Sequence, residues 1–193
     1  GVICMAQKAD LPAHMGYAGR ALPYGDVKVM KSETEEAAEG EVGEIWIRGA
    51  AVTPGYWNRP DATEEAFVED WLKSGDIGRR DETGRLSVED RIKDMYISGG
   101  ENVYPAEVES VLMAHPDIRE VAVIGVADDK WGEVGCAVIA SISGGPISLE
   151  AAQAQCEGHL ARFKWPRQVV HTEALPRNST GKVQKFILRQ QCT

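Results

Sequence analysis

The chain of 193 residues is long enough for one or two small domains, each with a hydrophobic core. Its apolar content of 43% and charged content of 26% are ordinary for a globular protein. A net charge of −9 argues against general binding to nucleic acids or anionic membranes. The charge is uneven, because acidic residues cluster between Glu33 and Glu44 and the stretch from Lys164 to Arg189 is basic. The basic stretch leaves room for an anionic small-molecule ligand.

The four cysteines, Cys4, Cys136, Cys156 and Cys192, show neither Cys-x-x-Cys spacing nor a disulfide framework. We therefore expect reduced, mostly buried thiols in a cytoplasmic protein. No apolar run is long enough to span a bilayer, and the N-terminal residues lack the pattern of a secretion signal. The chain begins at Gly1 without an initiator Met and continues into an apolar run, which is typical of a cut within a longer protein.

The first part of the chain predicts an antiparallel pair of strands. Residues 26–30 (DVKVM) and 44–48 (EIWIR) alternate apolar and polar side chains, as half-buried strands do. An acidic turn over residues 31–43 joins them. Residues 1–6 are expected to contain a short strand end, and residues 10–25, rich in Gly and Pro, are expected to form a loop.

A short helix and two turns are predicted next. Residues 61–67 have a helical pattern, and Asp61 and Glu64 have the spacing of a capping box. A turn flanked by apolar residues is expected over residues 73–78, and a hairpin turn over residues 81–85.

Residues 84–105 have the pattern of a hinge. Residues 86–88 alternate like a strand, and residues 89–94 are a run of charges around one Ile. The β-prone residues 95–97 then lead into a glycine turn at residues 98–100. We interpret this stretch as a charged joint between two bodies of the protein.

After the joint, helices and strands alternate in the order of a small α+β domain. The predicted elements are a helix at 105–114, strands at 118–126 and 134–142, a helix at 149–162 capped by Ser148, a strand at 167–172, and a short helix within 181–192.

Lys182 is a candidate for phosphate or carboxylate binding. It ends the run Ser179-Thr180-Gly181-Lys182, but Pro176 replaces the first glycine of a phosphate loop and Val183 follows the lysine. A Gly-Lys tip can still place one ammonium on an anion. The alternative is an exposed surface lysine.

Five further positions have a functional and a structural interpretation. The Asp76 carboxylate has the chemistry to accept two ribose hydroxyls, or it forms an Asx turn or a cap. Arg91 and Lys93 share one side of an extended strand, where they either serve one anion or form a solvated charged edge. Gly99 and Gly100 either permit close approach of a ligand or form a plain hairpin turn.

The histidines, His14, His115, His159 and His171, show no metal-ligand spacing, and no Ser/His/Asp or Cys/His arrangement is evident. The sequence therefore predicts no metal site in this chain. Packing roles are expected for two aromatic motifs, Trp131-Gly132-Glu133 and Tyr56-Trp57.

Taken in order, these motifs resemble the C-terminal part of the adenylate-forming enzymes. That superfamily includes acyl- and aryl-CoA synthetases, firefly luciferase and the adenylation domains of peptide synthetases. The resemblance covers nearly the whole chain and is greatest to the medium/long-chain and aryl acyl-CoA synthetases. It rests on the segments GEIWIRG (43–49), GYW (55–57), SGD (74–76), DRIKD (90–94), SGGENVYPAEVE (98–109), WGE (131–133) and PRNSTGK (176–182).

The resemblance implies an α+β fold with a domain boundary after residue 92. Residues 1–92 would be the β-rich end of a large AMP-binding domain, and residues 93–193 a mobile C-terminal domain with helices on a three-stranded sheet. The implied activity is that of an acid–CoA ligase. A carboxylic acid, fatty or aryl, reacts with Mg-ATP to form an acyl-adenylate, and coenzyme A then displaces AMP.

The resemblance also assigns roles in the first half-reaction. Lys182 would bridge the attacking carboxylate and the α-phosphate and stabilise the developing charge. Asp76 would bind the ribose hydroxyls, and Arg91 the ribose or a phosphate. Lys93 matches the hinge about which the small domain swings between half-reactions.

For the second half-reaction, the swing would bring Gly99 and Gly100 to line the pantetheine tunnel. Lys164 and Arg167 would meet the phosphates of CoA. Two departures from the family pattern are Ser74, where Thr is more usual, and Tyr96, at an often aliphatic position.

The phosphate loop, the magnesium ligands and the acyl pocket are expected upstream of Gly1, in an N-terminal domain that this chain would need as its partner. We therefore expect the chain alone to be inactive, and we leave a homo-oligomer open. Two alternatives are a non-catalytic ligand-binding or interaction module and the adenylation domain of a peptide synthetase. The second is disfavoured, because no phosphopantetheine serine motif follows before Thr193.

Overall fold

The computed structural model describes residues 2–10 and 16–192, so His14 and part of the predicted loop at 10–25 lie outside the described residues. The chain forms two compact units, residues 1–92 and residues 93–193. Each unit has its own sheet and its own core, and each is described separately.

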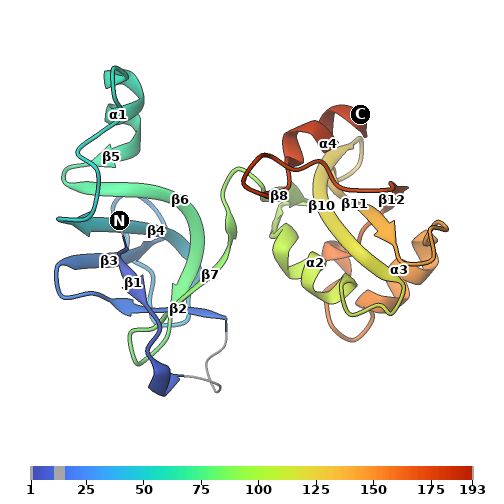
Figure 1. Cartoon of the computed structure of the whole chain (residues 1–193), viewed down its shortest axis with the longest axis horizontal. Helices are drawn as coiled ribbons and strands as arrows, with labels where there is room; N and C mark the ends of the chain where they lie inside the picture. Colours follow the sequence, from blue (N-terminus) through green and yellow to red (C-terminus); the bar gives the residue numbers. More distant parts are fainter. Residues whose placement is uncertain (1, 11–15, 193) are drawn as a thin grey trace. The chain divides into compact units, whose positions relative to one another are not determined.

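In the described residues, unit 1 is a seven-stranded antiparallel sheet (Figure 1). The strand order is β1-β2-β7-β6-β4-β3, and β5 pairs with β6. Its elements are β1 (Cys4–Met5), the 3-10 turn η1 (Lys8–Asp10), β2 (Tyr17–Ala21), β3 (Gly25–Met30), β4 (Gly43–Gly49), α1 (Pro60–Ala66), β5 (Phe67–Val68), β6 (Trp71–Arg80) and β7 (Leu86–Arg91).

The predicted strand pair at 26–30 and 44–48 is confirmed, because β3 and β4 pair antiparallel with Val27 opposite Ile47. The prediction of loop for residues 10–25 is wrong where β2 pairs with β7. The misleading signal is partly Gly19, where a Cβ atom would lie 2.0 Å from the backbone of Met5. This glycine allows β1 to lie close against β2 and does not mark a loop.

The turn predicted at 73–78 is instead a bulge within the continuous strand β6. Glu44 of β4 lies opposite Ile77, whereas Trp46, two residues further, lies opposite Lys73. The extra residues of β6 are accommodated around Gly75, which has a φ of +72°. Such a bulge bends a strand and redirects its side chains. It therefore controls how Asp76, the next residue, is presented.

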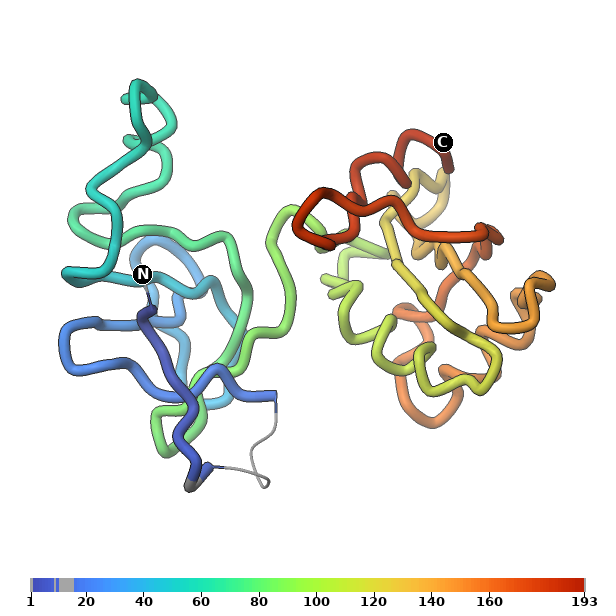
Figure 2. Tube along the Cα trace, viewed as in Figure 1, coloured from blue at the N-terminus to red at the C-terminus, as the bar shows by residue number. Residues whose placement is uncertain are grey.

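Helix α1 forms where it was predicted, but not with the predicted capping box. Pro60 occupies the first turn, Arg59 is the N-cap residue, and no side chain caps the helix. The Asp61 carboxylate pairs with the Arg59 guanidinium, 3.1 Å from Nε. Helix α1 extends away from the sheet of unit 1, as Figure 1 and Figure 2 show, whereas β5 belongs to the sheet and pairs with β6.

The described part of unit 2 has a five-stranded sheet in the order β10-β11-β8-β9, with β12 parallel to β11. Its elements are β8 (Tyr96–Ser98), β9 (Glu101–Val103), α2 (Pro105–Leu112), β10 (Ile118–Asp128), β11 (Gly132–Ser141), α3 (Leu149–Cys156), the 3-10 turn η2 (Arg162–Lys164), β12 (Gln168–His171) and α4 (Lys185–Gln191).

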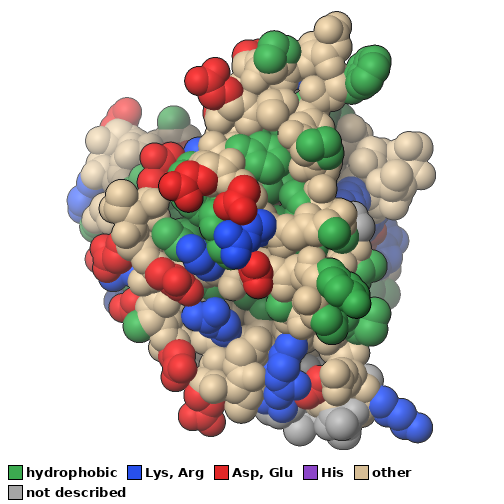
Figure 3. All heavy atoms as spheres, turned by 90° about the vertical axis from the view of Figure 1, so that its left-hand side faces the viewer, with side chains coloured by type: hydrophobic (Ala, Val, Ile, Leu, Met, Phe, Trp, Pro, Cys, Tyr) green, Lys and Arg blue, Asp and Glu red, His purple; other side chains and the backbone are tan. Residues whose placement is uncertain are grey.

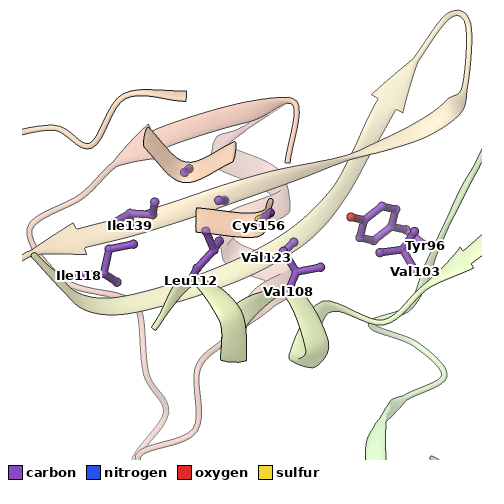
Figure 4. Close-up of a cluster of buried hydrophobic side chains, with 10 residues drawn as sticks. Tyr96, Val103, Val108, Leu112, Ile118, Val123, Ile139 and Cys156 are labelled. Atoms are coloured by element: carbon purple, nitrogen blue, oxygen red, sulfur yellow. The ribbon is translucent and has the colours of Figure 1, made fainter. Parts of the chain in front are cut away.

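The central hairpin β10–β11 is buried on both faces. On one face, Val108 and Leu112 of α2 point toward Val123 of β10 and Cys156 of α3 (Figure 4). On the other face, Leu188 of α4 packs with alternate residues of the same two strands. Strands covered on both faces are nearly continuous in apolar residues, which explains the apolar runs in this part of the sequence.

The α+β class is confirmed, but the three-stranded sheet is not. Two short strands, β8 and β9, form the predicted glycine hairpin and extend the sheet beyond β11. Ser148 caps α3 as predicted, and its hydroxyl accepts from the Ala151 N–H at 3.2 Å. The helix ends at Cys156 and not near residue 162, because Glu157 is extended and Gly158 has a φ of +76°.

Candidate functional site

Asp76 and Arg91 form one part of the site, in unit 1. They lie opposite each other on β6 and β7, and the Arg91 Nε lies 2.8 Å from Asp76 Oδ1. The side chains are 31% and 49% exposed, so a ligand can reach the pair. Within the described ranges, Asp76 Oδ2 accepts no hydrogen bond, which leaves this oxygen available for a hydroxyl donor.

The bulge that presents Asp76 is held from both sides. The Gly75 N–H donates to Glu44 Oε1 at 3.1 Å, and the Asp76 N–H donates to Ser74 Oγ at 3.0 Å. The other carboxylate oxygen of Glu44 accepts from the Trp46 indole at 2.9 Å, which fixes the Glu44 side chain. Ser74, the mild departure from the family pattern, thus supplies a local hydrogen bond that a Thr hydroxyl could also make.

Lys182 lies on an exposed loop of unit 2, between β12 and α4. Its backbone N–H donates to Asn178 Oδ1 at 2.9 Å, and its carbonyl accepts from the Asn178 N–H at 2.9 Å. No described residue forms a hydrogen bond or ion pair with the Lys182 ammonium. The backbone is therefore held while the charged end of the side chain is available for an anion.

An ion pair between Arg177, on the same loop, and Glu120 attaches this loop to β10. Arg177 Nη2 lies 2.6 Å from Glu120 Oε1, and Arg177 Nη1 donates to the Gly181 carbonyl at 2.8 Å. The Arg177 guanidinium, helped by the Leu175 N–H, holds the pKa of the Glu120 carboxyl below its usual value. The carboxylate is therefore ionised, and the pair persists, across the neutral pH range.

Lys93 is the first residue of unit 2 and is exposed. Its carbonyl accepts from Arg189 Nη2 of α4 at 3.2 Å, and the same guanidinium lies 3.4 Å from Asp94 Oδ1. The beginning of unit 2 is thereby attached to its C-terminal helix.

Gly99 and Gly100 form the two-residue turn between β8 and β9, with φ of +62° and +89°. Positive φ at both positions is typical of a type I′ hairpin. A Cβ at Gly99 would lie 2.7 Å from the Trp131 ring, whereas a Cβ at Gly100 would meet open space. The Trp131 ring therefore occupies the space beside Gly99, and Gly100 is the more accessible of the two.

A pocket of about 470 Å³ in unit 2 contains one of the two predicted CoA-binding cations. The Arg167 guanidinium lies over the Trp131 ring, 5.4 Å from its centroid, and faces this pocket. Lys164 is not among the lining residues, and its ammonium is paired with both Glu107 oxygens at 2.6 and 2.8 Å. The lining residues are Ser98, Trp131, Gln153, Arg162, Phe163, Trp165 and Arg167.

Sequence reasoning missed Arg162, Phe163 and Trp165, which join Arg167 in this pocket. The available signal was the alternation of basic and aromatic residues in RFKWPR (162–167). Two guanidinium groups with aromatic faces can bind phosphate and a planar base together.

Comparisons with known proteins identify the family. The AMP-binding enzyme family model matches residues 1–57, and the model of the AMP-binding enzyme C-terminal domain matches residues 107–182. These matches together span more than half of the chain. The chain therefore belongs to the AMP-binding, adenylate-forming enzymes, as the sequence motifs indicated.

The relatives include CoA ligases. The chain is 47% identical over 176 residues to the long-chain-fatty-acid–CoA ligase FadD13 of Mycobacterium tuberculosis, covering 91% of this chain and 35% of that protein. It is 40% identical over 189 residues to the indoleacetate–CoA ligase of Aromatoleum aromaticum, covering 98% of this chain and 37% of that protein. The chain thus spans little more than a third of the length of these relatives.

A solved structure has the same fold. The o-succinylbenzoate CoA synthetase of Bacillus subtilis, in complex with its acyl-adenylate intermediate, matches with a TM-score of 0.88 and 38% identity. The match covers 99% of this chain and 38% of that one.

In the described part of the chain, no group of three or more His, Cys, Asp or Glu side chains could hold a metal ion. No described helix is long and apolar enough to cross a membrane. On the face drawn in Figure 3, acidic and basic side chains are interspersed, and no purely basic patch gathers there.

Proposed function

We propose that this chain supplies nucleotide-binding and CoA-binding groups to an AMP-forming acid–CoA ligase. Such an enzyme converts a carboxylic acid, fatty or aryl, and ATP to an acyl-adenylate and pyrophosphate. It then transfers the acyl group to coenzyme A and releases AMP. The observation that carries the proposal is the accessible Asp76–Arg91 pair on a bulged strand, in a chain that also presents Lys182 on an anchored loop.

In the first half-reaction, Asp76 binds the ribose and Arg91 orients it. Carboxylate oxygens accept hydroxyl hydrogen bonds, and Asp76 Oδ2 has this capacity left. Arg91 fixes the Asp76 side chain through Oδ1 and has further N–H donors for the ribose or a phosphate. The pair therefore binds the nucleotide without taking part in bond formation.

Lys182 acts on the reacting groups. Its ammonium lies between the substrate carboxylate and the α-phosphate and draws the two anions together. As the carboxylate oxygen attacks phosphorus and pyrophosphate leaves, negative charge grows on the phosphoryl oxygens, and the ammonium stabilises it. The support is the exposed ammonium, which has no partner among the described residues, on a held backbone.

For this step, residues 93–193 act as a mobile domain that pivots at Lys93. The contact boundary between Ile92 and Lys93 supports this position for the hinge. No described group of His, Cys, Asp or Glu side chains has the composition of a metal site. No magnesium ligand is therefore assigned to this chain.

In the second half-reaction, Gly100 and Gly99 border the path of pantetheine, and Arg167 binds phosphate of CoA. The pocket beside Arg167 supports this role, because its aromatic walls and second guanidinium suit a phosphorylated nucleotide. Lys164 takes part only after leaving the Glu107 carboxylate, which makes it the weaker candidate.

The test is acid-dependent pyrophosphate release by the complete protein that contains this chain. A panel of fatty and aryl acids is supplied with ATP, and CoA is then added. We expect pyrophosphate release with at least one acid and a CoA thioester after CoA addition. Nucleotide binding without pyrophosphate release from any acid would instead support a non-catalytic module.

A further inference from the structure

The loop that carries Lys182 is closed by a set of hydrogen bonds to one side chain. Asn178 Oδ1 accepts from the Thr180 N–H at 3.0 Å, from the Thr180 hydroxyl at 2.8 Å and from the Lys182 N–H at 2.9 Å. The Gly181 N–H donates to the Asn178 carbonyl at 2.9 Å. Residues 178–182 therefore have a defined shape although they are exposed.

The Arg177 side chain connects this closed loop to the sheet. The Arg177 guanidinium donates from Nη1 to the Gly181 carbonyl and from Nη2 to Glu120 Oε1. Glu120 is on β10, and its Oε2 accepts from the Leu175 N–H at 3.4 Å. One arginine thus connects the residue before Lys182 to a strand of the buried hairpin.

We propose that Arg177, Glu120 and Asn178 are positioning residues for Lys182. The inference rests on the proposed function, in which the Lys182 ammonium must meet two anionic groups at once. A lysine side chain has a flexible stem, so the placement of its ammonium depends on a fixed backbone. Small misplacements of a catalytic group reduce rates strongly. The Arg177 fork binds the carbonyl and Asn178 Oδ1 binds the N–H of the peptide group that joins Gly181 to Lys182, so the two side chains together fix that backbone.

A role in general stability alone predicts different behaviour. Arg177 and Glu120 are 44% and 26% exposed, and ion pairs at such sites contribute little to folding. Variants of the pair are therefore expected to fold, and their effects are expected to concentrate on the loop. The substitution Arg177→Lys keeps the charge next to Glu120 but replaces the planar fork with a single ammonium.

The first experiment measures backbone amide hydrogen exchange in the 193-residue chain. In Arg177→Lys we expect exchange across residues 178–182 to be about tenfold faster, with the melting temperature little changed. Arg119→Lys is the matched control, because Arg119 lies next to Glu120 on β10 and, like Arg177, donates to a loop carbonyl, that of Glu173. Unchanged exchange in Arg177→Lys, or equal acceleration in both variants, would overturn the inference.

A double variant separates the two functions of Arg177. Exchanging the charges, with Glu120→Arg and Arg177→Glu together, restores an ion pair but leaves no donor at position 177 for the Gly181 carbonyl. We expect stability to stay close to that of the wild type while loop exchange remains fast. Slow loop exchange in the double variant would show that the ion pair alone holds the loop, against the proposal.

The second experiment measures both half-reactions in the complete protein. For Arg177→Lys we expect kcat of adenylation to fall about tenfold with KM for ATP unchanged, and thioester formation from a supplied acyl-adenylate to be unaffected. An equal loss in both half-reactions would contradict the proposal that Arg177 positions Lys182. If the wild-type protein forms no acyl-adenylate, the proposed function fails and so does the catalytic part of this inference, while the exchange data still decide whether Arg177 anchors the loop.

Discussion

Asp76 and Arg91 face each other across β6 and β7, with Arg91 Nε 2.8 Å from Asp76 Oδ1. The pair lies at the bulge of β6, one residue after Gly75, and the Ile92 N–H donates to the Gly75 carbonyl at 2.9 Å. The end of unit 1 is thereby attached directly to the bulge. The proposed ribose site and the chain segment leading to unit 2 are thus built from the same few residues.

Replacing Arg91 tests the nucleotide role of this pair. In the complete protein, we expect Arg91→Gln to raise KM for ATP several-fold, because a donor to the nucleotide is lost. Stability should change by less than about 1 kcal/mol, since the pair is half exposed. Arg79→Gln is the matched control, because Arg79 forms a 3.0 Å ion pair with Glu89 on the same two strands. Equal KM values for the Arg91 variant and the wild type would remove Arg91 from the site.

The two hairpin glycines are expected to respond differently to a methyl group. Gly100→Ala meets open space, so it should cost only the backbone strain of positive φ, about 1–2 kcal/mol. Gly99→Ala also forces the Trp131 ring to move and should cost roughly 1–3 kcal/mol more. Denaturant unfolding of the two variants measures the difference directly. Equal destabilisation would contradict the contact between Gly99 and Trp131.

The Tyr96 hydroxyl is a buried polar group that has no hydrogen-bond partner among the described residues. Tyr96 is 2% exposed, and it belongs to the hydrophobic core cluster that includes Val108 and Leu112 of α2. Because an unpaired buried hydroxyl is unfavourable, Tyr96→Phe should raise the free energy of unfolding by roughly 1 kcal/mol. Tyr96→Ala, which removes the ring, should lower it by about 3–5 kcal/mol. A clear loss of stability in the Phe variant would reveal a partner for the hydroxyl.

Asp81 closes the β6–β7 turn and gives stability a predictable acid dependence. Partial burial raises its pKa, but hydrogen bonds from Thr83 and Arg85 prevail and lower the pKa from 3.8 to about 2. Its ionised form therefore stabilises the fold fully above about pH 4, and this contribution is lost as pH falls toward 2. The stability difference between wild type and Asp81→Asn should shrink over that range.

The control for this titration is Glu82→Gln, on the same turn. Glu82 is exposed and makes no hydrogen bond to the described residues of the turn. Its substitution should leave the acid dependence unchanged. Parallel unfolding curves for wild type and Asp81→Asn from pH 4 to pH 2 would exclude the assigned role of Asp81.

Much of the fold could be predicted from local patterns. The β3–β4 pair, the glycine hairpin, the Ser148 cap and the strands at 118–126 and 134–142 follow from alternation, turn chemistry and apolar runs. Two of the errors arose where glycine has a tertiary role. Gly19 permits a close strand contact, and Gly75 a bulge, and both have the same local signature as a loop.

The candidate site was predictable only in part. Motifs indicated Asp76, Arg91 and Lys182, but the ion pairs that hold Arg91 and engage Lys164 join residues far apart in sequence. Spacing carries no information on such partners. The Arg177–Glu120 pair, separated by 57 positions, was missed for the same reason.

The most direct test of the central claim is the effect of Lys182→Ala on the two half-reactions of the complete protein. We predict a loss of adenylation of about a hundredfold or more, with thioester formation from a supplied acyl-adenylate largely retained. Lys8→Ala, at an exposed lysine of unit 1, is the control and should change neither rate. Equal loss in both half-reactions, or normal adenylation by the Lys182 variant, would contradict the proposed role of Lys182.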